Sequence, residues 1–236
     1  EYFSEGISDE LLNMLCKLPQ LTVASRTSSY SFKGENLDIP TIAGSLGVDA
    51  ILEGSVRRSG DRVRITAQLI EADTDRHLWS ENFDRELVDI FAIQDEIANA
   101  IVQALTGKLG VGAERAISVE AATENLDAYE MYLKARELFL KRADLPESIR
   151  LYRQAIELDP SFVRAWEGLA AVEAVANDWI PDDTDHVPLA REAAEKALSL
   201  DADLSMPLAV LGSVAANADK DLIRAIDYFN AALEKE

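Results

Sequence analysis

The stretch Ala165-Trp166-Glu167-Gly168-Leu169-Ala170 shows the pattern that organises the second half of the chain. A large apolar residue opens a helical segment, and a small residue follows one turn later. A second helical segment then carries small residues at helical spacing, namely Ala190, Ala194 and Ala197. Because this motif recurs from Ala128 onward, the sequence predicts three pairs of helices stacked side by side.

The two flanking copies match the central one at their small and aromatic positions. The first copy contains Ala135, Ser148, Tyr152 and Ala155 and closes on Leu158-Asp159-Pro160. The third copy contains Leu211-Gly212, Ala225, Phe229 and Ala232. The motif resembles the tetratricopeptide repeat (TPR), whose period is about 34 residues. We therefore predict repeats at residues 126–161, 162–203 and 204–236.

The spacing of the copies supports this resemblance. Ala155 and Ala197 are 42 residues apart (197 − 155), and Ala197 and Ala232 are 35 residues apart (232 − 197). We attribute the longer interval to an insert at residues 177–183, between the two helices of the second copy. The helix crossings are expected to bury a shared set of side chains: Tyr152, Ala155, Trp166, Leu169, Ala194, Ala197 and Phe229.

The TPR resemblance implies a chain that binds other polypeptides. In repeats of this kind the first helix of each pair lines a concave groove. Five residues match groove positions and are expected to face a partner: Tyr129, Tyr132, Arg136, Arg164 and Glu167. Aromatic and arginine side chains are common anchors of protein interfaces. The alternative for Tyr129 and Tyr132 is that they pack between helices.

The ends of the chain suggest further expectations. The chain opens on Glu1-Tyr2-Phe3 without an initiator methionine, so we expect a segment upstream. We also expect further repeats after Glu236, because the first repeat ends in a turn that the third does not reach. A terminal repeat with an uncovered apolar helix face favours homo-oligomers.

The first half of the chain carries the strongest strand signal. Residues 63–69 alternate, with Val63, Ile65, Ala67 and Leu69 on one face. They follow the turn Ser59-Gly60-Asp61, which is typical of a hairpin. We predict antiparallel strands near 50–57, 62–71 and 76–83, covered on one face by helices that include residues 87–109. The predicted fold class is α+β: a small α/β domain with a mainly antiparallel sheet, then an all-α TPR superhelix.

Shorter segments complete the predicted domain. Ser8, followed by two acids, predicts a helix that ends at Pro19, and residues 21–25 read as a short strand. A polar loop is expected at 26–35 and a short helix at 41–46, ending at Gly47. The domains are then residues 1–112 and 126–236, joined by a linker of Gly, Ala, Ser, Thr and acids at 113–125.

Six segments in order resemble the amino-terminal domain of the TolB family, over nearly all of residues 1–108. They are residues 3–11 (FSEGISDEL), 23–29 (VASRTSS), 52–56 (LEGSV), 65–70 (ITAQLI), 77–80 (HLWS) and 91–97 (FAIQDEI). In bacterial signalling proteins such a domain lies between an effector and TPRs, and the effector is commonly a class III adenylate or guanylate cyclase or a winged-helix regulator. This sequence lacks the strand that usually precedes the first helix, which leaves a sheet edge uncovered.

Composition excludes several classes of function. The net charge of −20 argues against nucleic acid, whose phosphates require a basic surface. No apolar run approaches the roughly 20 residues of a membrane span. Cys16 is the single cysteine, which excludes an internal disulfide, and we expect it to be buried in the first helix. With two histidines and no phosphate-binding loop or nucleophile elbow, the sequence predicts no cofactor, no metal and no catalysis.

Two clusters keep other hypotheses open. Arg57, Arg58, Arg62 and Arg64 surround the hairpin tip and are candidates for contact with an anion, which would make the domain a small-ligand sensor. The alternative is that these arginines form a solvated face and balance the charge of the local acids Glu53 and Asp61. His186 lies near Asp182, Asp183 and Asp185 as a weak metal-site candidate, whose alternative is a solvated acidic loop. A third hypothesis makes the chain an accessory part of a larger cyclase whose catalytic domain lies outside it.

Overall fold

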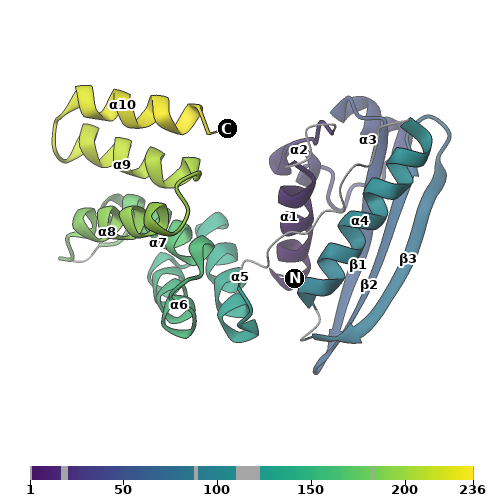
Figure 1. Ribbon diagram of the computed structural model, residues 1–236, viewed down its shortest axis with the longest axis horizontal. Coiled ribbons are helices and arrows are strands. Elements are labelled where there is room, and N and C mark those ends of the chain that lie inside the picture. Colours follow the sequence, from purple (N-terminus) through teal and green to yellow (C-terminus); the bar gives the residue numbers. More distant parts are fainter. Residues whose placement is uncertain (1, 17–20, 88–89, 110–122, 182, 236) are drawn as a thin grey trace. The chain divides into compact units, whose positions relative to one another are not determined.

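The computed structural model describes residues 2–16, 21–87, 90–109, 123–181 and 183–235. The chain forms two compact units, Glu1–Glu120 and Ala121–Glu236, each of which is described by itself. The first unit contains a three-stranded sheet with helices, and the second consists of helix pairs (Figure 1). The predicted α+β fold class is therefore confirmed. Most of the expected linker at 113–125 lies outside the described residues.

The sheet of the first unit is an antiparallel meander in the order β1-β2-β3. Its strands are β1 (Ala50–Ser59), β2 (Arg62–Glu71) and β3 (Arg76–Glu86), and the predicted strands are confirmed with slightly longer ends. Gly60 adopts a positive φ of 59° between β1 and β2, a conformation that glycine tolerates best. The alternation in β2 buries one face of the sheet, formed by Val63, Ile65, Ala67 and Leu69.

Helices cover that apolar face. The helices of this unit are α1 (Tyr2–Cys16), α2 (Arg26–Tyr30), α3 (Ile39–Leu46) and α4 (Ile90–Leu109), of which α1 and α4 pack on the sheet and on each other (Figure 1). The predicted short helix is α3. The Asp38 carboxylate caps α3 by accepting from the Thr41 N–H at 2.9 Å, and Gly47 ends it in the left-handed region at φ 67°.

Four expectations for the start of the chain are wrong. Helix α1 begins at Tyr2, so Ser8 is inside it and donates its hydroxyl to the Ser4 carbonyl at 3.1 Å. The predicted strand at 21–25 is not part of the sheet, because Ser25 instead caps α2, where a loop was expected. Cys16 is exposed, since it is the last residue of α1.

The second unit consists of three helix pairs, as predicted. The pairs are α5 (Leu126–Leu140) with α6 (Leu145–Leu158), α7 (Val163–Trp179) with α8 (His186–Leu200), and α9 (Ser205–Asn217) with α10 (Leu222–Leu233). The predicted insert lies in the last turn of α7 and the connection to α8. Small side chains let the helices approach closely, and the fully buried alanines of this unit include Ala135, Ala155, Ala165, Ala170, Ala190, Ala194 and Ala197.

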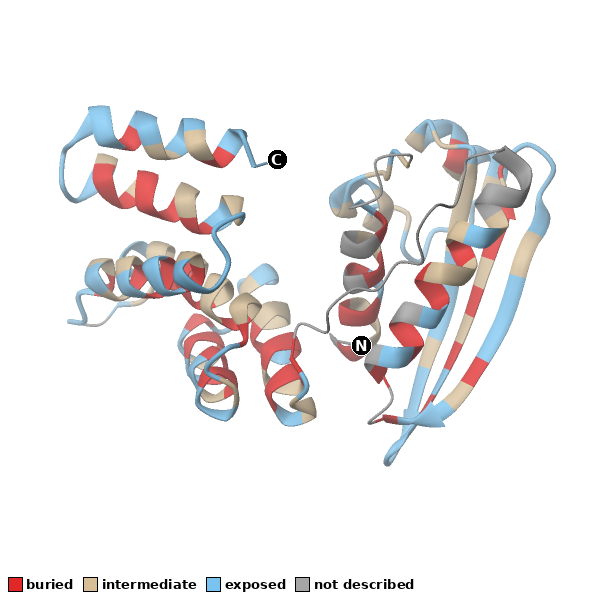
Figure 2. Cartoon of the chain, in the orientation of Figure 1, coloured by how far each residue is buried: buried red, intermediate tan, exposed pale blue. Residues whose placement is uncertain are grey.

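Two of the side chains expected in this core are only partly buried. Trp166 is half-buried, and its indole Nε1–H donates to the Pro160 carbonyl at 3.0 Å. Phe229 is 40% exposed, because α10 packs against α9 on one side and presents its other side to solvent (Figure 2). The buried positions of Tyr152, Ala155, Leu169, Ala194 and Ala197 are confirmed.

The turn after α6 ties the end of one helix to the start of another. The Asp159 carboxylate accepts from the Ser161 N–H at 2.9 Å and from the Thr123 hydroxyl at 2.5 Å. Asn125 caps α5 through the Ala128 N–H at 3.0 Å, and its side-chain amide donates to the Leu158 carbonyl at 3.2 Å. These polar contacts hold the two ends of the first helix pair together.

Candidate protein-binding surface

The two tyrosines expected in the groove lie in an aromatic core. Tyr129 is 1% exposed and Tyr132 is 6% exposed. The Tyr132 ring lies 5.0 Å from the Phe162 ring and 6.1 Å from the Tyr152 ring, centroid to centroid. Such contacts add to the stabilisation from burial alone. Both tyrosines therefore pack between helices, which was the alternative interpretation. The prediction that they face an exposed groove is wrong, because both side chains are buried in the helix core.

Two of the predicted charged residues gather around Tyr152. A Cβ atom added at Gly168 on α7 would lie 2.4 Å from the Tyr152 ring, so α7 runs directly over this ring. Burial raises the pKa of Tyr152 well above its usual value, with Glu167 adding to the effect and Arg136 opposing it. Arg136 of α5 and Glu167 of α7 therefore both lie within electrostatic range of the Tyr152 hydroxyl.

The third charged residue, Arg164, lies on the same helix as Glu167. The two are three residues apart on α7, a spacing that places them on one face of the helix. Arg136, Arg164 and Glu167 are all half-buried, and each also interacts within the chain. We call these three residues the α5–α7 surface. It offers two cations and one anion on the first helices of the first two repeats.

A buried ionic cluster lies between α6, α7 and α8 and was not predicted. The Glu173 side chain is fully buried, and its carboxylate accepts from Arg153 Nη2 at 2.7 Å and lies 2.5 Å from His186 Nδ1. A buried carboxylate needs such partners, because removal from water is costly. The sequence signal was a lone acid within the apolar run at residues 169–176.

This cluster also contains His186, the histidine that the sequence offered as a metal-site candidate. His186 is the first residue of α8, and its Nδ1 lies 2.5 Å from the buried Glu173 carboxylate. Asp185 caps α8 by accepting from the Val187 N–H at 3.1 Å, while Asp182 lies outside the described residues. Across the part of the chain that the structure describes, no group of three or more His, Cys, Asp or Glu side chains is placed to hold a metal ion.

The hairpin arginines are engaged by an acid on the neighbouring strand. Arg62 Nη2 and Arg64 Nη2 lie 2.7 Å and 2.5 Å from opposite oxygens of Asp84. Their hydrogen bonds hold the pKa of Asp84 below its usual value. Arg58 donates to the Gly60 carbonyl at 3.1 Å, and Arg57 is the register partner of Arg64. Arg62 and Arg64 thus pair with a local acid, Asp84, that was not predicted, and contact of the four arginines with an anion stays a prediction.

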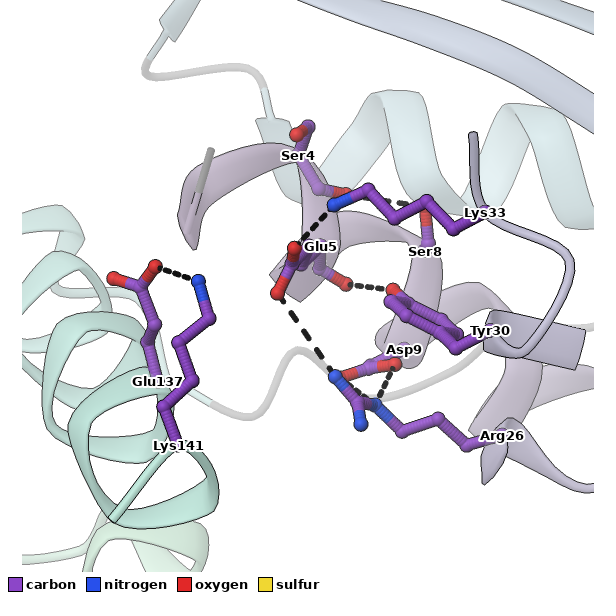
Figure 3. A network of polar contacts seen from close by, with 9 residues as sticks. All are labelled: Ser4, Glu5, Ser8, Asp9, Arg26, Tyr30, Lys33, Glu137 and Lys141. Carbon is purple, nitrogen blue, oxygen red and sulfur yellow. Dashed lines mark hydrogen bonds and ion pairs between the residues drawn. The ribbon is translucent and has the colours of Figure 1, made fainter. Parts of the chain in front are cut away.

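A polar network fastens α2 to α1 in the first unit (Figure 3). Arg26 Nε donates to both Asp9 oxygens at 2.8 and 2.9 Å, and the guanidinium carbon lies 4.2 Å from the Tyr30 ring centre. Tyr30 donates its hydroxyl to the Glu5 carbonyl at 3.3 Å, and Lys33 reaches the Glu5 carboxylate at 2.5 Å. Asp9 is 3% exposed, so Arg26 is the partner that makes its burial tolerable.

Of the helices in the described ranges, none is long and apolar enough to cross a bilayer.

Comparison with known proteins places the chain beside one cyclase-named protein. No protein-family model matches the chain. A segment of "Putative adenylate cyclase 3" from Rhizobium meliloti (strain 1021) is 36% identical over 204 residues, covering 85% of this chain. The chain spans 35% of that relative's length. The crystal structure of MamA aligns with 63% of this chain and 74% of its own, at 19% identity and a TM-score of 0.39. The expected similarity to a cyclase-named protein is confirmed for this segment, whereas the resemblance of residues 1–108 to the TolB amino-terminal domain stays a prediction.

Proposed function

We propose that this chain is a regulatory and protein-interaction module of a bacterial signalling protein. The first helices of its first two pairs carry the half-buried charged residues of the α5–α7 surface, and the chain is similar to a segment of a cyclase-named protein. In this proposal, residues 1–112 are a TolB-like accessory domain and residues 126–236 are the recognition domain. The catalytic domain of a larger cyclase lies outside the chain, and the chain itself performs no chemistry.

The partner-binding site in this proposal is the α5–α7 surface. The observation that carries it is that Gly168 of α7 lies against the Tyr152 ring, while Arg136 of α5 and Glu167 of α7 both act electrostatically on the Tyr152 hydroxyl and Arg164 lies one turn from Glu167 on α7. Tyr152 is buried and its ring packs against the Tyr132 ring of the aromatic core. The two arginines favour a peptide or protein segment with acidic groups. Their positive charge would attract such a segment even though the chain as a whole is negatively charged.

Binding of acidic peptides tests the proposal. Fluorescence anisotropy would compare labelled acidic peptides with matched basic peptides on the full chain. The double variant Arg136→Glu, Arg164→Glu should lose the acidic peptides, whereas Lys196→Glu on α8 should retain them. Unchanged melting temperatures would show that the variants remain folded. Retention of every peptide by the double variant would rule out the α5–α7 surface as the site.

A separate assay addresses the absence of catalysis. The purified chain should not convert ATP or GTP to a cyclic nucleotide at any concentration. Turnover that survives repurification would overturn the proposal that the catalytic domain lies elsewhere.

A further inference from the structure

The sheet of the first unit has one apolar face, on which α1 and α4 pack, and one polar face (Figure 1). Successive side chains of a strand point to opposite faces, so Arg64, between the buried Val63 and Ile65, belongs to the polar face. Its register partners are Arg57 on β1 and Asp84 on β3. Directly paired residues share a face of the sheet, so these three side chains form one row across the strands. We call Arg57, Arg64 and Asp84 the arginine row.

Arg57 and Arg64 are directly opposite each other, and of the two only Arg64 has a carboxylate partner. Paired residues of antiparallel strands have their Cβ atoms about 4.5–5.5 Å apart, and like charges at that distance repel. Arg64 donates from Nε and Nη2 to Asp84 Oδ2, at 3.1 and 2.5 Å. Among the residues that the structure describes, no carboxylate pairs with Arg57. Glu53, the acid of β1, is four residues away, about 13 Å along the strand. A bound anion would neutralise the charge that remains on this arginine pair.

Two neighbouring side chains add donors to the arginine row. Arg62, two residues before Arg64 on β2, donates from Nε and Nη2 to Asp84 Oδ1 at 3.2 and 2.7 Å, so both arginines share one carboxylate. In neither of them does Nη1 take part in these bonds. Ser55, two residues before Arg57 on β1, is exposed, and within the described ranges its hydroxyl has no partner. The polar face therefore offers three donor groups at adjacent positions, from Arg57, Arg64 and Ser55.

Arg58, the fourth arginine of the predicted cluster, belongs to the apolar face. It is the register partner of the buried Val63, and its guanidinium carbon lies 5.8 Å from the centre of the Phe3 ring on α1. The structure thus divides the hairpin arginines between the two faces of the sheet. The anion site that the sequence suggests is narrowed to the three arginines of the polar face.

These donors fit a phosphate group better than a carboxylate. A phosphate group has three strong acceptor oxygens and nearly two negative charges, whereas a carboxylate has two oxygens and one charge. Guanidinium groups bind phosphate oxygens through pairs of hydrogen bonds. In the three strands, which the structure describes throughout, Trp79 and Phe83 both pair with residues of the apolar face. The polar face therefore has no Trp, Tyr or Phe ring on which a base could stack, and it would select the phosphate group itself.

We propose that the polar face of the sheet binds the phosphate group of a small molecule between Arg57 and Arg64, with the Ser55 hydroxyl as a further donor. The bound phosphate neutralises the repulsion between the two arginines. The site lies in the first unit and is independent of the α5–α7 surface, so either proposal can fail without the other.

Calorimetric titration of the full chain tests the proposal with inorganic phosphate, glycerol phosphate and acetate at equal ionic strength. Both phosphate compounds should bind at least about tenfold more tightly than acetate. Tighter binding of glycerol phosphate would assign the site to a phosphorylated small molecule, whereas equal or weaker binding would assign it to free phosphate. In either case the backbone amide NMR signals of Ser55, Arg57 and Arg64 should shift during the titration.

Three variants identify the site. Arg57→Gln should weaken phosphate binding at least about tenfold, and because Arg57 is exposed the fold should survive. Arg76→Gln, a matched change at an exposed arginine at the other end of β3, should leave binding unchanged. Asp84→Asn should tighten binding about threefold or more, because it removes a negative charge and frees Arg62 and Arg64.

Four results would overturn the proposal. The first three are no binding of either phosphate compound, acetate binding as tight as that of phosphate, and phosphate binding that survives Arg57→Gln. The fourth is loss of phosphate binding in the double variant Arg136→Glu, Arg164→Glu, which would move the site to the α5–α7 surface. We expect this double variant to bind phosphate as the natural chain does.

Discussion

Gly168 of α7 lies directly against the Tyr152 ring of α6, so that a Cβ atom at Gly168 would come within 2.4 Å of two ring carbons. The Tyr152 ring is 1% exposed and packs against Tyr132, so it has no open space in which to move. Gly212 of α9 stands in a similar relation to Phe229 of α10, at 2.7 Å. The Phe229 ring, however, is partly exposed and can rotate outward.

Alanine at these two glycines should therefore have different effects. Gly168→Ala should lower the free energy of unfolding by about 1–3 kcal/mol, because it overpacks a closed crossing. Gly212→Ala should change it by less than about 1 kcal/mol, because the gain in helix propensity offsets a small ring movement. Urea unfolding of both variants measures the difference. Equal losses would show that the two crossings are equally rigid.

The repeat architecture was predictable because its signal is local. Small residues at helical spacing reveal helix crossings, and the alternation of Val63 to Leu69 reveals a half-covered sheet. Trp166 and Phe229 show the limit of this reasoning. Matching a repeat motif assumes that every helix is covered on both sides, but α10 presents one side to solvent.

The candidate site was less predictable because it depends on contacts between distant residues. Tyr129 and Tyr132 matched groove positions, yet their exposure is decided by Tyr152 and Phe162, which come from other elements. The pairing of Asp9 with Arg26 likewise joins residues 17 positions apart. Side-chain partners across such separations have no periodic signal in a single sequence.

The Glu173 cluster should be a major source of stability for the second repeat. Glu173→Ala removes the carboxylate that holds His186 and Arg153, and it leaves a cavity in the buried crossing. Breaking a buried ion pair costs about 3–5 kcal/mol of the free energy of unfolding. Because the Arg153 side chain is partly exposed to solvent, we expect a loss at the lower end of that range. Chemical denaturation would measure the loss.

Glu195→Ala is the matched control for this change, because Glu195 is an exposed acid on α8. It should change the free energy of unfolding by no more than about 0.5 kcal/mol. Similar stabilities for the two variants would mean that Glu173 is tolerated in the core rather than required there.

Gly54 should be essential for pairing of the first hairpin. A Cβ atom at this position would lie 2.3 Å from the Thr66 carbonyl oxygen, which belongs to the backbone of β2 and cannot rotate away. Gly54→Ala should lower the melting temperature of the first unit, because overpacking should reduce its free energy of unfolding by about 1–3 kcal/mol. Ser55→Ala, at the next and exposed position of β1, is the control. A Gly54→Ala variant as stable as that control would contradict the backbone spacing described here.

Acid should weaken the turn that joins the first two repeats. Burial raises the pKa of Asp159, but hydrogen bonds from Ser161 and Thr123 outweigh it, and the pKa of the folded carboxyl lies below its ordinary value. The unfolded chain therefore binds the proton more readily. The stabilisation from this group is complete above the ordinary aspartate pKa of about 3.9, and it is lost as pH falls through the lower folded value.

Asp159→Asn isolates this contribution from the other acids of the chain. The variant should be less stable than the natural chain near neutral pH, and the gap between them should shrink as the pH falls below about 4. Glu192→Gln, which removes one exposed carboxylate from α8, is the control for the change in charge. Urea unfolding across this pH range provides the measurement. A gap that stayed constant with pH would show that the Asp159 contacts do not depend on its charge.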